Sequence, residues 1–411
     1  MINIVQNWLT PTHRPIGVDF GTDCLRMAQV QFHGGEPRLI AAGSADVPFD
    51  LHGNQAGRAE FFVRKVREIL ATGNFRGRQI LLALPAALTS IISVAVSATE
   101  QARAKEKIAA AVGQTLGIDP GDALIREVVI AEANQEALTR EVAVIAAPRS
   151  QIHSMLAAAA EARLEVVGMN VEPSAIIDCF SHVYRRRGDL VSTTCFVDIG
   201  ACRTRLVVAR AEKIFDACTI PMGGLDFTGA VAKAAAVSID EARLLRLKIC
   251  HADTQLEEHH DKRELYVARS VAGSADIERQ RKIVDAACRG LLRNLIQKIE
   301  EFRGRFSQRF GSSPIDRLVF VGGEAHNRVL CRSIARAMGL SALVGDPLLR
   351  MSRPSDVGFG SGIDRREPQP AWAVAIGLSL GPPASAPIDD RRARPLSSHL
   401  PRWVHLTENK R

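Results

Sequence analysis

The chain has 411 residues, of which 46% are hydrophobic and 24% charged, and its formal net charge at pH 7 is +8. This length supplies enough apolar material for the cores of two or three domains. No apolar run approaches the roughly 18 to 20 residues of a membrane span, and residues 1–9 are too few and too polar for a signal peptide, so we expect a soluble, cytoplasmic chain. The eight cysteines have neither CxxC spacing nor paired histidines, which favours reduced thiols over metal ligands.

The positive charge does not by itself indicate nucleic acid. Arginines cluster at residues 185–187 and 391–394, but aromatic residues are only 5% of the chain and do not interleave with these clusters as stacking platforms would. Attraction to an anionic membrane surface or an acidic partner matches the charge equally well. We therefore expect no nucleic-acid partner.

The first ordered element is a hairpin at residues 17–26 (GVDFGTDCLR), in which an apolar strand reaches Asp19, turns at Gly21 and leaves along a strand over residues 25–32. Glycine permits backbone conformations in which the turn amides point at phosphate oxygens, and Thr22 adds a hydroxyl. A single Asp-x-Gly turn is more often just the opening of a hairpin.

The segments after the first hairpin predict further elements and then a separate unit. The hairpin unit ends near residues 47–48, and the pattern of apolar residues after it predicts a helix over 59–71 and a buried strand over 79–84. A small α/β unit follows, with strands over 91–96, 125–132 and 141–146 and helices over 100–116 and 149–162.

A strand over 164–169 then leads into residues 170–175 (NVEPSA), which open a helix to about Tyr184. Glu172 lies at the start of that helix. It is a candidate for positioning a water in line with a γ-phosphate. The alternative is an acid stabilised by the helix macrodipole, and the sequence leaves both open.

The hairpin motif occurs a second time at residues 196–205 (FVDIGACRTR), with Asp198 and Gly200 in the places of Asp19 and Gly21, and Thr204 adds a hydroxyl. Arg26 and Arg205 also share a register. Two copies predict two halves that face one nucleotide. Asp19 and Asp198 would then lie near the accompanying Mg²⁺, with water between, because Mg²⁺ sheds its waters reluctantly.

The last third of the chain adds a third glycine site. Residues 221–228 (PMGGLDFT) end one strand and begin a helix, and an amphipathic helix is predicted over 277–306. A buried strand then ends at Gly322 and Gly323 and feeds a helix over 329–338, so a ligand can approach its backbone closely. Small residues at 373–378 would let two helices cross closely.

In this order, the motifs resemble those of the actin-like ATPase superfamily, and within it the PilM family of type IV pilus assembly, with FtsA of cell division as its near relative. The resemblance covers residues 14–380 and implies an α/β, actin-like (ribonuclease H-like) two-lobed ATPase fold with an inserted α/β subdomain in the first lobe. It implies these boundaries: an N-terminal extension, 1–13; first-lobe core, 14–85 and 164–190; inserted subdomain, 86–163; second-lobe core, 191–233 and 315–380; helical subdomain, 234–314; a disordered tail, 381–411.

The resemblance also implies the ligands, ATP and Mg²⁺, and the residues that meet them. The metal would lie at Asp19 and Asp198, and Glu172 would be the catalytic residue. The nucleotide contacts that it implies are Asp19, Gly21, Thr22, Asp23, Cys24, Asp198, Gly200, Ala201, Thr204, Gly223, Gly224, Arg246, Gly322, Gly323, Glu324 and Asn327.

Three positions depart from the family pattern. Arg243 and Arg246 stand where a ribose-binding Glu and Lys are common, and Arg243 cannot accept a hydrogen bond from a ribose hydroxyl. Glu324 adds a carboxylate where small residues are usual, and His326 is read as a surface or capping residue. We therefore expect ATP binding with slow or absent turnover.

The resemblance implies a scaffold rather than a fast enzyme. Its partner would be the N-terminal cytoplasmic peptide of a PilN-like bitopic protein, held in the groove between the first lobe and the inserted subdomain. The chain would associate with itself and reach the inner face of the cell membrane through its partner. An FtsA-like filament protein and a slow phosphotransferase are the alternatives, and the proline-rich end, without a clear amphipathic helix, favours the PilM reading over FtsA.

Overall fold

A computed structural model describes residues 12–84, 89–97, 101–134, 139–258, 275–311, 314–352, 362–364 and 367–381. The expected N-terminal extension, apart from its last two residues, and the expected tail after Gly381 lie outside the described residues. Within the described residues, no helix combines the length and the apolarity that a membrane span requires.

The first lobe is built on a six-stranded sheet in the order β1-β3-β2-β5-β9, with β4 paired to β3. Its strands are β1 (Thr12–His13), β2 (Ile16–Phe20), β3 (Cys24–His33), β4 (Glu36–Asp46), β5 (Gln79–Leu84) and β9 (Glu165–Val171). The β2–β3 pair is antiparallel, whereas β2–β5 and β5–β9 are parallel. Strand β5 has the bounds predicted for it. Its side chains are buried on both faces, which explains its unbroken apolar sequence.

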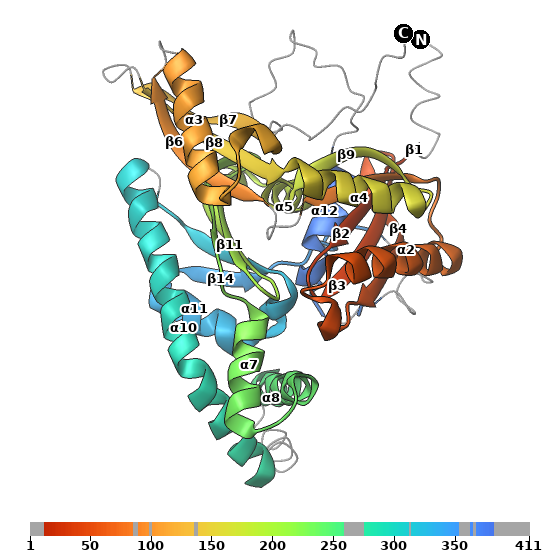
Figure 1. Ribbon diagram of the computed structural model, residues 1–411. Coiled ribbons are helices and arrows are strands. Elements are labelled where there is room, and N and C mark those ends of the chain that lie inside the picture. The colour runs from red at the N-terminus through yellow and green to blue at the C-terminus, as the bar shows by residue number, and fades with distance from the viewer. Residues whose placement is uncertain are drawn as a thin grey trace.

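Helices cover both faces of this sheet. Leu82 packs with α2 (Gln55–Thr72) and α4 (Arg149–Glu161), whereas its neighbour Leu81 packs with α5 (Glu172–Ser181) and α12 (Ala373–Leu380). Figure 1 shows α5 and α12 in the middle of the molecule, between the two lobes. The alternation follows from the two-residue period of a strand.

The second lobe repeats this pattern of strands. Its five-stranded sheet has the order β12-β11-β10-β13-β14. The strands are β10 (Thr193–Ile199), β11 (Thr204–Arg210), β12 (Lys213–Ile220), β13 (Arg317–Val321) and β14 (Ser341–Val344). As in the first lobe, an antiparallel hairpin, β10–β11, lies beside a parallel strand, β13. Each hairpin also continues into a third antiparallel strand, β4 or β12, which the sequence reading did not separate.

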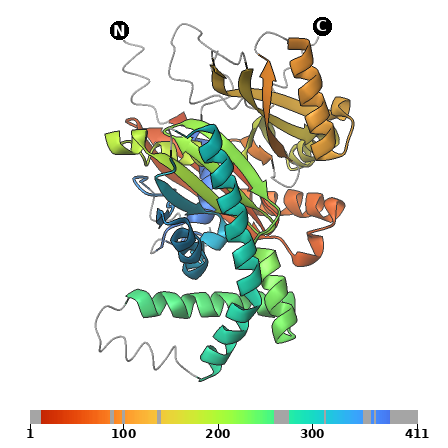
Figure 2. The same ribbon diagram turned by 90° about the vertical axis from the view of Figure 1, so that its left-hand side faces the viewer.

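The outer face of the second sheet is covered by α10 (Ala275–Arg309) and α11 (Arg328–Met338). Its helical extension consists of α7 (Gly224–Ala235) and α8 (Ile239–Glu258), which pack with the first part of α10. Figure 2 shows α10 running along the sheet toward these two helices. Its buried stripe includes Leu295, Ile299, Phe302 and Phe306, at the spacing that the sequence predicted.

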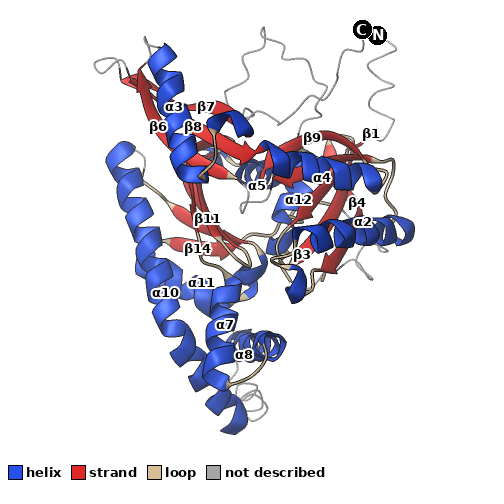
Figure 3. Cartoon of the chain, in the orientation of Figure 1, coloured by secondary structure: helices blue, strands red, loops and turns tan. Residues whose placement is uncertain are grey.

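A third sheet, β6-β8-β7, lies at one end of the molecule (Figure 3). Its elements are β6 (Ser90–Ser97), α3 (Gln101–Leu116), β7 (Ala123–Asn134) and β8 (Thr139–Pro148). Val112 and Ile108 of α3 fill its core against Val144 of β8. Strands β6 and β7 also contact β12 of the second lobe. The shorter helical segments are η1 (Phe49–Leu51), η2 (Pro120–Asp122), α6 (Arg187–Val191), η3 (Gly323–His326) and η4 (Pro370–Trp372).

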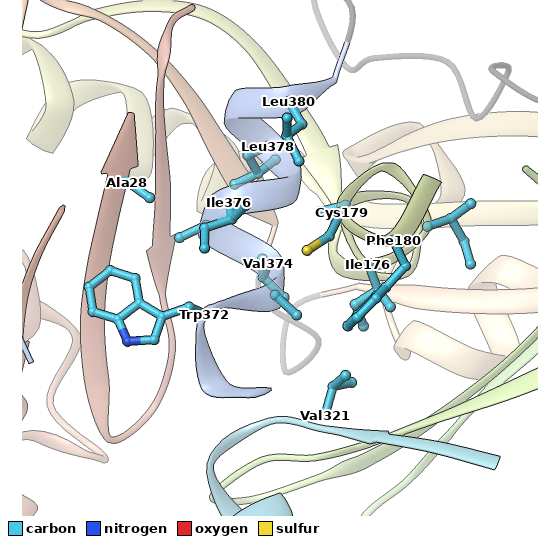
Figure 4. Packing of buried hydrophobic residues seen from close by; sticks show 14 of the residues in the cluster. Ala28, Ile176, Cys179, Phe180, Val321, Trp372, Val374, Ile376, Leu378 and Leu380 are labelled. Atoms are coloured by element: carbon cyan, nitrogen blue, oxygen red, sulfur yellow. The ribbon is translucent and has the colours of Figure 1, made fainter. Parts of the chain in front are cut away.

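The central core joins the two sheets through α5 and α12. Figure 4 shows Ile376 and Leu378 of α12 between Ala28 of β3 and Cys179 of α5. Gly377 allows the predicted close crossing, because a Cβ there would lie 1.8 Å from the Ala175 carbonyl oxygen of α5. One packed layer therefore belongs to both lobes.

Candidate functional site

The two Asp-x-Gly hairpins have the same turn. The Gly21 N–H donates to the Cys24 carbonyl at 3.1 Å, and the Gly200 N–H donates to the Arg203 carbonyl at 2.9 Å. In the strand registers, Asp19 is opposite Arg26 and Asp198 is opposite Arg205. The repeat in the sequence is thus a repeat in three dimensions.

The loops of the two hairpins meet between the lobes. Burial raises the pKa of the Cys202 thiol, and the Thr22 side chain of the first hairpin opposes this shift. Burial raises the pKa of Asp23, the nearby Arg243 guanidinium and His52 oppose this shift, and Glu324 adds to it. The structure therefore brings residues of the first hairpin loop, the second hairpin loop and the Gly-Gly loop near one another. The binding of one nucleotide between them stays a prediction.

One basic side chain that sequence reasoning missed supports the first loop. The Arg58 guanidinium of α2 donates to the carbonyls of Gly21 at 2.8 Å and Thr22 at 3.0 Å. It also lies over the Phe20 ring, 4.5 Å from its centroid. Nothing in the sequence around Arg58 marks this role, because it depends on how α2 packs on the sheet.

Beside the second hairpin turn, Arg205 joins two buried carboxylates. Its Nε donates to Asp198 Oδ2 at 2.9 Å, and its Nη2 lies 2.6 Å from the same oxygen. Its Nη1 forms an ion pair with Glu172 Oε2. The shared register of Arg26 and Arg205 was visible in the sequence, but the pairing of Arg205 with Glu172 was not.

Burial controls the charges of this cluster. It raises the pKa of Asp198 to about 7, the Asp19 carboxylate adds to the shift, and the Arg26 guanidinium opposes it. Burial also raises the pKa of Asp19, against the charges of Arg26 and Arg205. Burial lowers the pKa of Arg205 to about 10, and Asp19 counteracts this, so the guanidinium stays charged at neutral pH. The two guanidinium groups are what make these buried carboxylates tolerable.

The Gly-Gly loop packs directly on the second hairpin. Gly322 has a φ of +85°, and a Cβ at this position would lie 2.3 Å from Asp198 Oδ1. The Gly322 N–H donates to the Pro370 carbonyl at 3.1 Å, which ties the loop to the segment before α12. Only glycine meets both the backbone and the space requirement here.

The Gly223-Gly224 turn also supports the second hairpin. The Gly224 N–H donates to the Gly200 carbonyl at 2.9 Å, and the Leu225 N–H donates to the Ala201 carbonyl at 2.8 Å. These two amides are already used by the protein. The predicted contact of Gly223 and Gly224 with nucleotide stays a prediction, and their observed role is to hold the loop.

Arg246 of α8 and Glu324 of η3 form an ion pair. The Arg246 Nη1 donates to Gly224 O at 3.0 Å, to Thr228 Oγ1 at 2.8 Å and to Glu324 Oε1 at 3.1 Å. The unusual Glu324 thus has a partner within the protein. This pair fixes α8 against the Gly-Gly loop, where the sequence predicted a ribose contact.

Other predicted site residues have structural bonds. The Thr204 hydroxyl donates to the Met222 carbonyl at 2.8 Å, and the Asn327 side chain accepts from the Leu330 N–H at 3.0 Å as the N-cap of α11. The Cys24 thiol donates to the Leu25 carbonyl, and burial raises its pKa to about 11. Their contacts with nucleotide remain predictions.

The residues do not fit a directly coordinated Mg²⁺ well. Asp oxygens are the ligands that Mg²⁺ prefers, but Asp198 Oδ2 is bonded to Arg205 and its Oδ1 lies against Gly322. Among the residues that the structure describes, no three His, Cys, Asp or Glu side chains come together in a way that could hold a metal ion.

We compared the chain with known protein families, curated proteins and solved structures. No family model matches the chain. The chain is 27% identical over 251 residues to the cell division protein FtsA of Rhizobium meliloti (strain 1021), a match that covers 58% of this chain. The chain spans about half the length of this curated relative, 50% of which is matched.

Among solved structures, the chain is similar to the PilM-PilN type IV pilus biogenesis complex, with a TM-score of 0.67 and 20% identity over 89% of this chain and 98% of that one. The similarity spans both lobes. The chain therefore has the two-lobed actin-like α/β fold in its PilM-like form, as its motifs predicted.

Proposed function

We propose that the chain is an ATP-binding scaffold protein of PilM type, which works in the cytoplasm at the inner face of the cell membrane in type IV pilus assembly. The observation that carries the nucleotide part is the meeting of two Asp-x-Gly turns of the same form, with the Thr22 side chain of one loop acting on the Cys202 thiol of the other. Paired glycine turns of this kind are the arrangement that a polyphosphate between two lobes requires.

The proposed partner is the N-terminal cytoplasmic peptide of a PilN-like bitopic protein, and the chain would reach the membrane through it. The similar structure is of a PilM-PilN complex, which supports this choice of partner. We place the peptide between the first lobe and the unit of residues 86–163. That unit also contacts β12 of the second lobe, so its position depends on how the lobes sit.

Nucleotide would then bias peptide capture and self-association. A ligand shifts a conformational equilibrium only by its difference in affinity for the two states, and the effect is reciprocal. In this protein, a ligand that contacts the Thr22 and Cys202 loops would affect the packing of α5 and α12. Residues of both lobes pack against these two helices. We propose a binding function with slow turnover, because the Glu172 carboxylate is paired with Arg205.

The test is a calorimetric titration of the full chain with ATP, with and without a synthetic N-terminal peptide of the bitopic protein encoded beside it. We expect each ligand to change the affinity for the other by the same factor, about 5-fold or more. The matched control is a peptide of the same composition in scrambled order. Tight ATP binding that the peptide never alters would refute the scaffold function.

A second function is favoured by one observation, the 27% identity to FtsA over 58% of the chain. An FtsA-like membrane tether predicts that the chain sediments with anionic vesicles and that deletion of residues 396–411 abolishes this. Sedimentation that the deletion leaves unchanged would argue against it. Recovery of division proteins alone in a pull-down, with no bitopic pilus protein, would argue for it.

A further inference from the structure

Arg205, Asp198 and Glu172 form an ion triad. The triad includes Asp198, one of the two residues at which the Mg²⁺ of a bound nucleotide was predicted. Arg205 has 9% of its surface exposed, Asp198 2% and Glu172 5%, so the three groups are shielded together. Two nitrogens of the guanidinium contact Asp198 Oδ2 and the third contacts Glu172 Oε2. Charge-assisted bonds of this kind are stronger than neutral ones and fix the geometry of all three side chains.

Asp198 is buried, and its two oxygens have little room for a cation. Oδ2 accepts from Arg205, and Oδ1 lies near the Cα of Gly322, where an added Cβ would be 2.3 Å away. A divalent cation would need one of these oxygens, directly or through a water, and would stand beside a guanidinium of the same sign. An arginine cannot give way by losing its proton at neutral pH.

The remaining carboxylate of the pair is also compensated. The charges of Arg26 and Arg205 both act on Asp19, and Asp19 is buried. The charges of Arg26 and Arg205 thus oppose those of the two aspartates, which would otherwise repel a polyphosphate.

We propose that Arg205 replaces the divalent metal, so that this chain binds the polyphosphate of a nucleotide in a Mg²⁺-independent way. This inference rests on the proposed binding of ATP. It also gives a reason for slow turnover. Phosphoryl transfer depends on metal ions that bridge the β- and γ-phosphates and on a group that orients water, and here Glu172 is held by Arg205.

The experiment compares ATP affinity of the full chain by calorimetry in excess EDTA and in excess Mg²⁺. The expected dissociation constants agree within about 2-fold, and a gain of about 10-fold or more with Mg²⁺ would overturn the proposal. Arg205→Ser uncovers Asp198 and Glu172, so its ATP affinity should become dependent on Mg²⁺. Arg205→Lys keeps the positive charge and should stay independent of the metal.

A second readout uses the metal alone. Binding of Mn²⁺ as a probe, followed by electron paramagnetic resonance, should be undetectable for the wild type and appear in Arg205→Ser. The matched control is Arg210→Ser on the same strand, where the guanidinium donates to Thr193 Oγ1 at 2.8 Å and faces no carboxylate of the triad. This control should bind no Mn²⁺.

The outcomes separate the two proposals. If ATP binds in neither buffer, the nucleotide function fails, and the Mn²⁺ experiment still decides the role of Arg205. If the wild type binds Mn²⁺ at this site, the replacement of metal by Arg205 is wrong even where ATP binds. If Arg205→Ser does not fold, the comparison of EDTA with Mg²⁺ in the wild type and in Arg205→Lys gives the answer.

Discussion

The crossing of α12 and α5 gives a sharp stability prediction. In Gly377→Ala, the new Cβ would lie 1.8 Å from the Ala175 carbonyl oxygen, whereas real Cβ contacts stay beyond 3.0 Å. The two helices must therefore separate by more than an ångström. Helix α12 cannot retreat to its other side, because a Cβ on Gly17 of β2 would lie 2.0 Å from the Ala375 carbonyl oxygen.

The magnitude follows from two opposing effects. Overpacking of a close-packed core costs about 3 kcal/mol at the upper end of the usual range. Alanine regains about 1 kcal/mol over glycine in a helix. We expect the free energy of unfolding of Gly377→Ala to fall by about 2 kcal/mol net.

The assay is equilibrium urea unfolding, with Gly290→Ala as the matched control. Gly290 lies in α10, and a Cβ there meets nothing within 4 Å, so this variant should gain up to about 1 kcal/mol. The two variants should then differ by about 3 kcal/mol. A Gly377→Ala protein within about 0.5 kcal/mol of the wild type would refute the reasoning, because that is the range of ordinary surface changes.

Three further predictions concern the hairpin and Gly-Gly loops. Gly322→Ala should lose at least about 1 kcal/mol in urea unfolding and weaken ATP binding, because its φ is +85° and its Cβ would meet Asp198. Gly323→Ala, with open space around its Cβ, should leave the free energy of unfolding unchanged. Asn327→Ala removes the N-cap of α11 and should lower the melting midpoint by an amount that corresponds to about 1 kcal/mol; an unchanged midpoint would contradict that role. Burial raises the pKa of Cys202, so its alkylation should stay slow until the pH exceeds the ordinary thiol range, and ATP should slow it further. Mass spectrometry checks this, and fast labelling at neutral pH would count against it.

Much of the fold could be read from local sequence. The Asp-x-Gly turn between two apolar strands, the unbroken apolar strand at residues 79–84 and the helical spacing of the buried stripe in α10 are patterns of neighbouring residues. The small residues of α12 predicted its close crossing, and the structure confirms it at Gly377. Strand β4 was missed as a separate element, and β12 was predicted only by its end near residue 221. Each carries mixed polar and apolar residues and lies beside a hairpin without a motif of its own.

The bonds within the site could not be read in this way. Arg246 and Glu324 are 78 positions apart, and no local sequence pattern near either residue predicts their pairing. The resemblance implied nucleotide contacts for Thr204 and Asn327, and these stay predictions. In the folded chain their side chains also bond backbone atoms that would otherwise lack partners, which the sequence did not show.

The sequence by itself determined that two equivalent hairpins exist, because strand and turn patterns are local and each hairpin closes within a few residues. The actin-like fold was implied by the resemblance of the ordered motifs to that superfamily. Only the tertiary structure decided which residues pair with the charged side chains of the hairpins. Arg205 reaches Glu172 because α5 and β11 pack together. Since these charged groups are buried, each would be costly to leave unpaired. The identity of that partner is fixed by three-dimensional distance, which a linear pattern of residues does not contain.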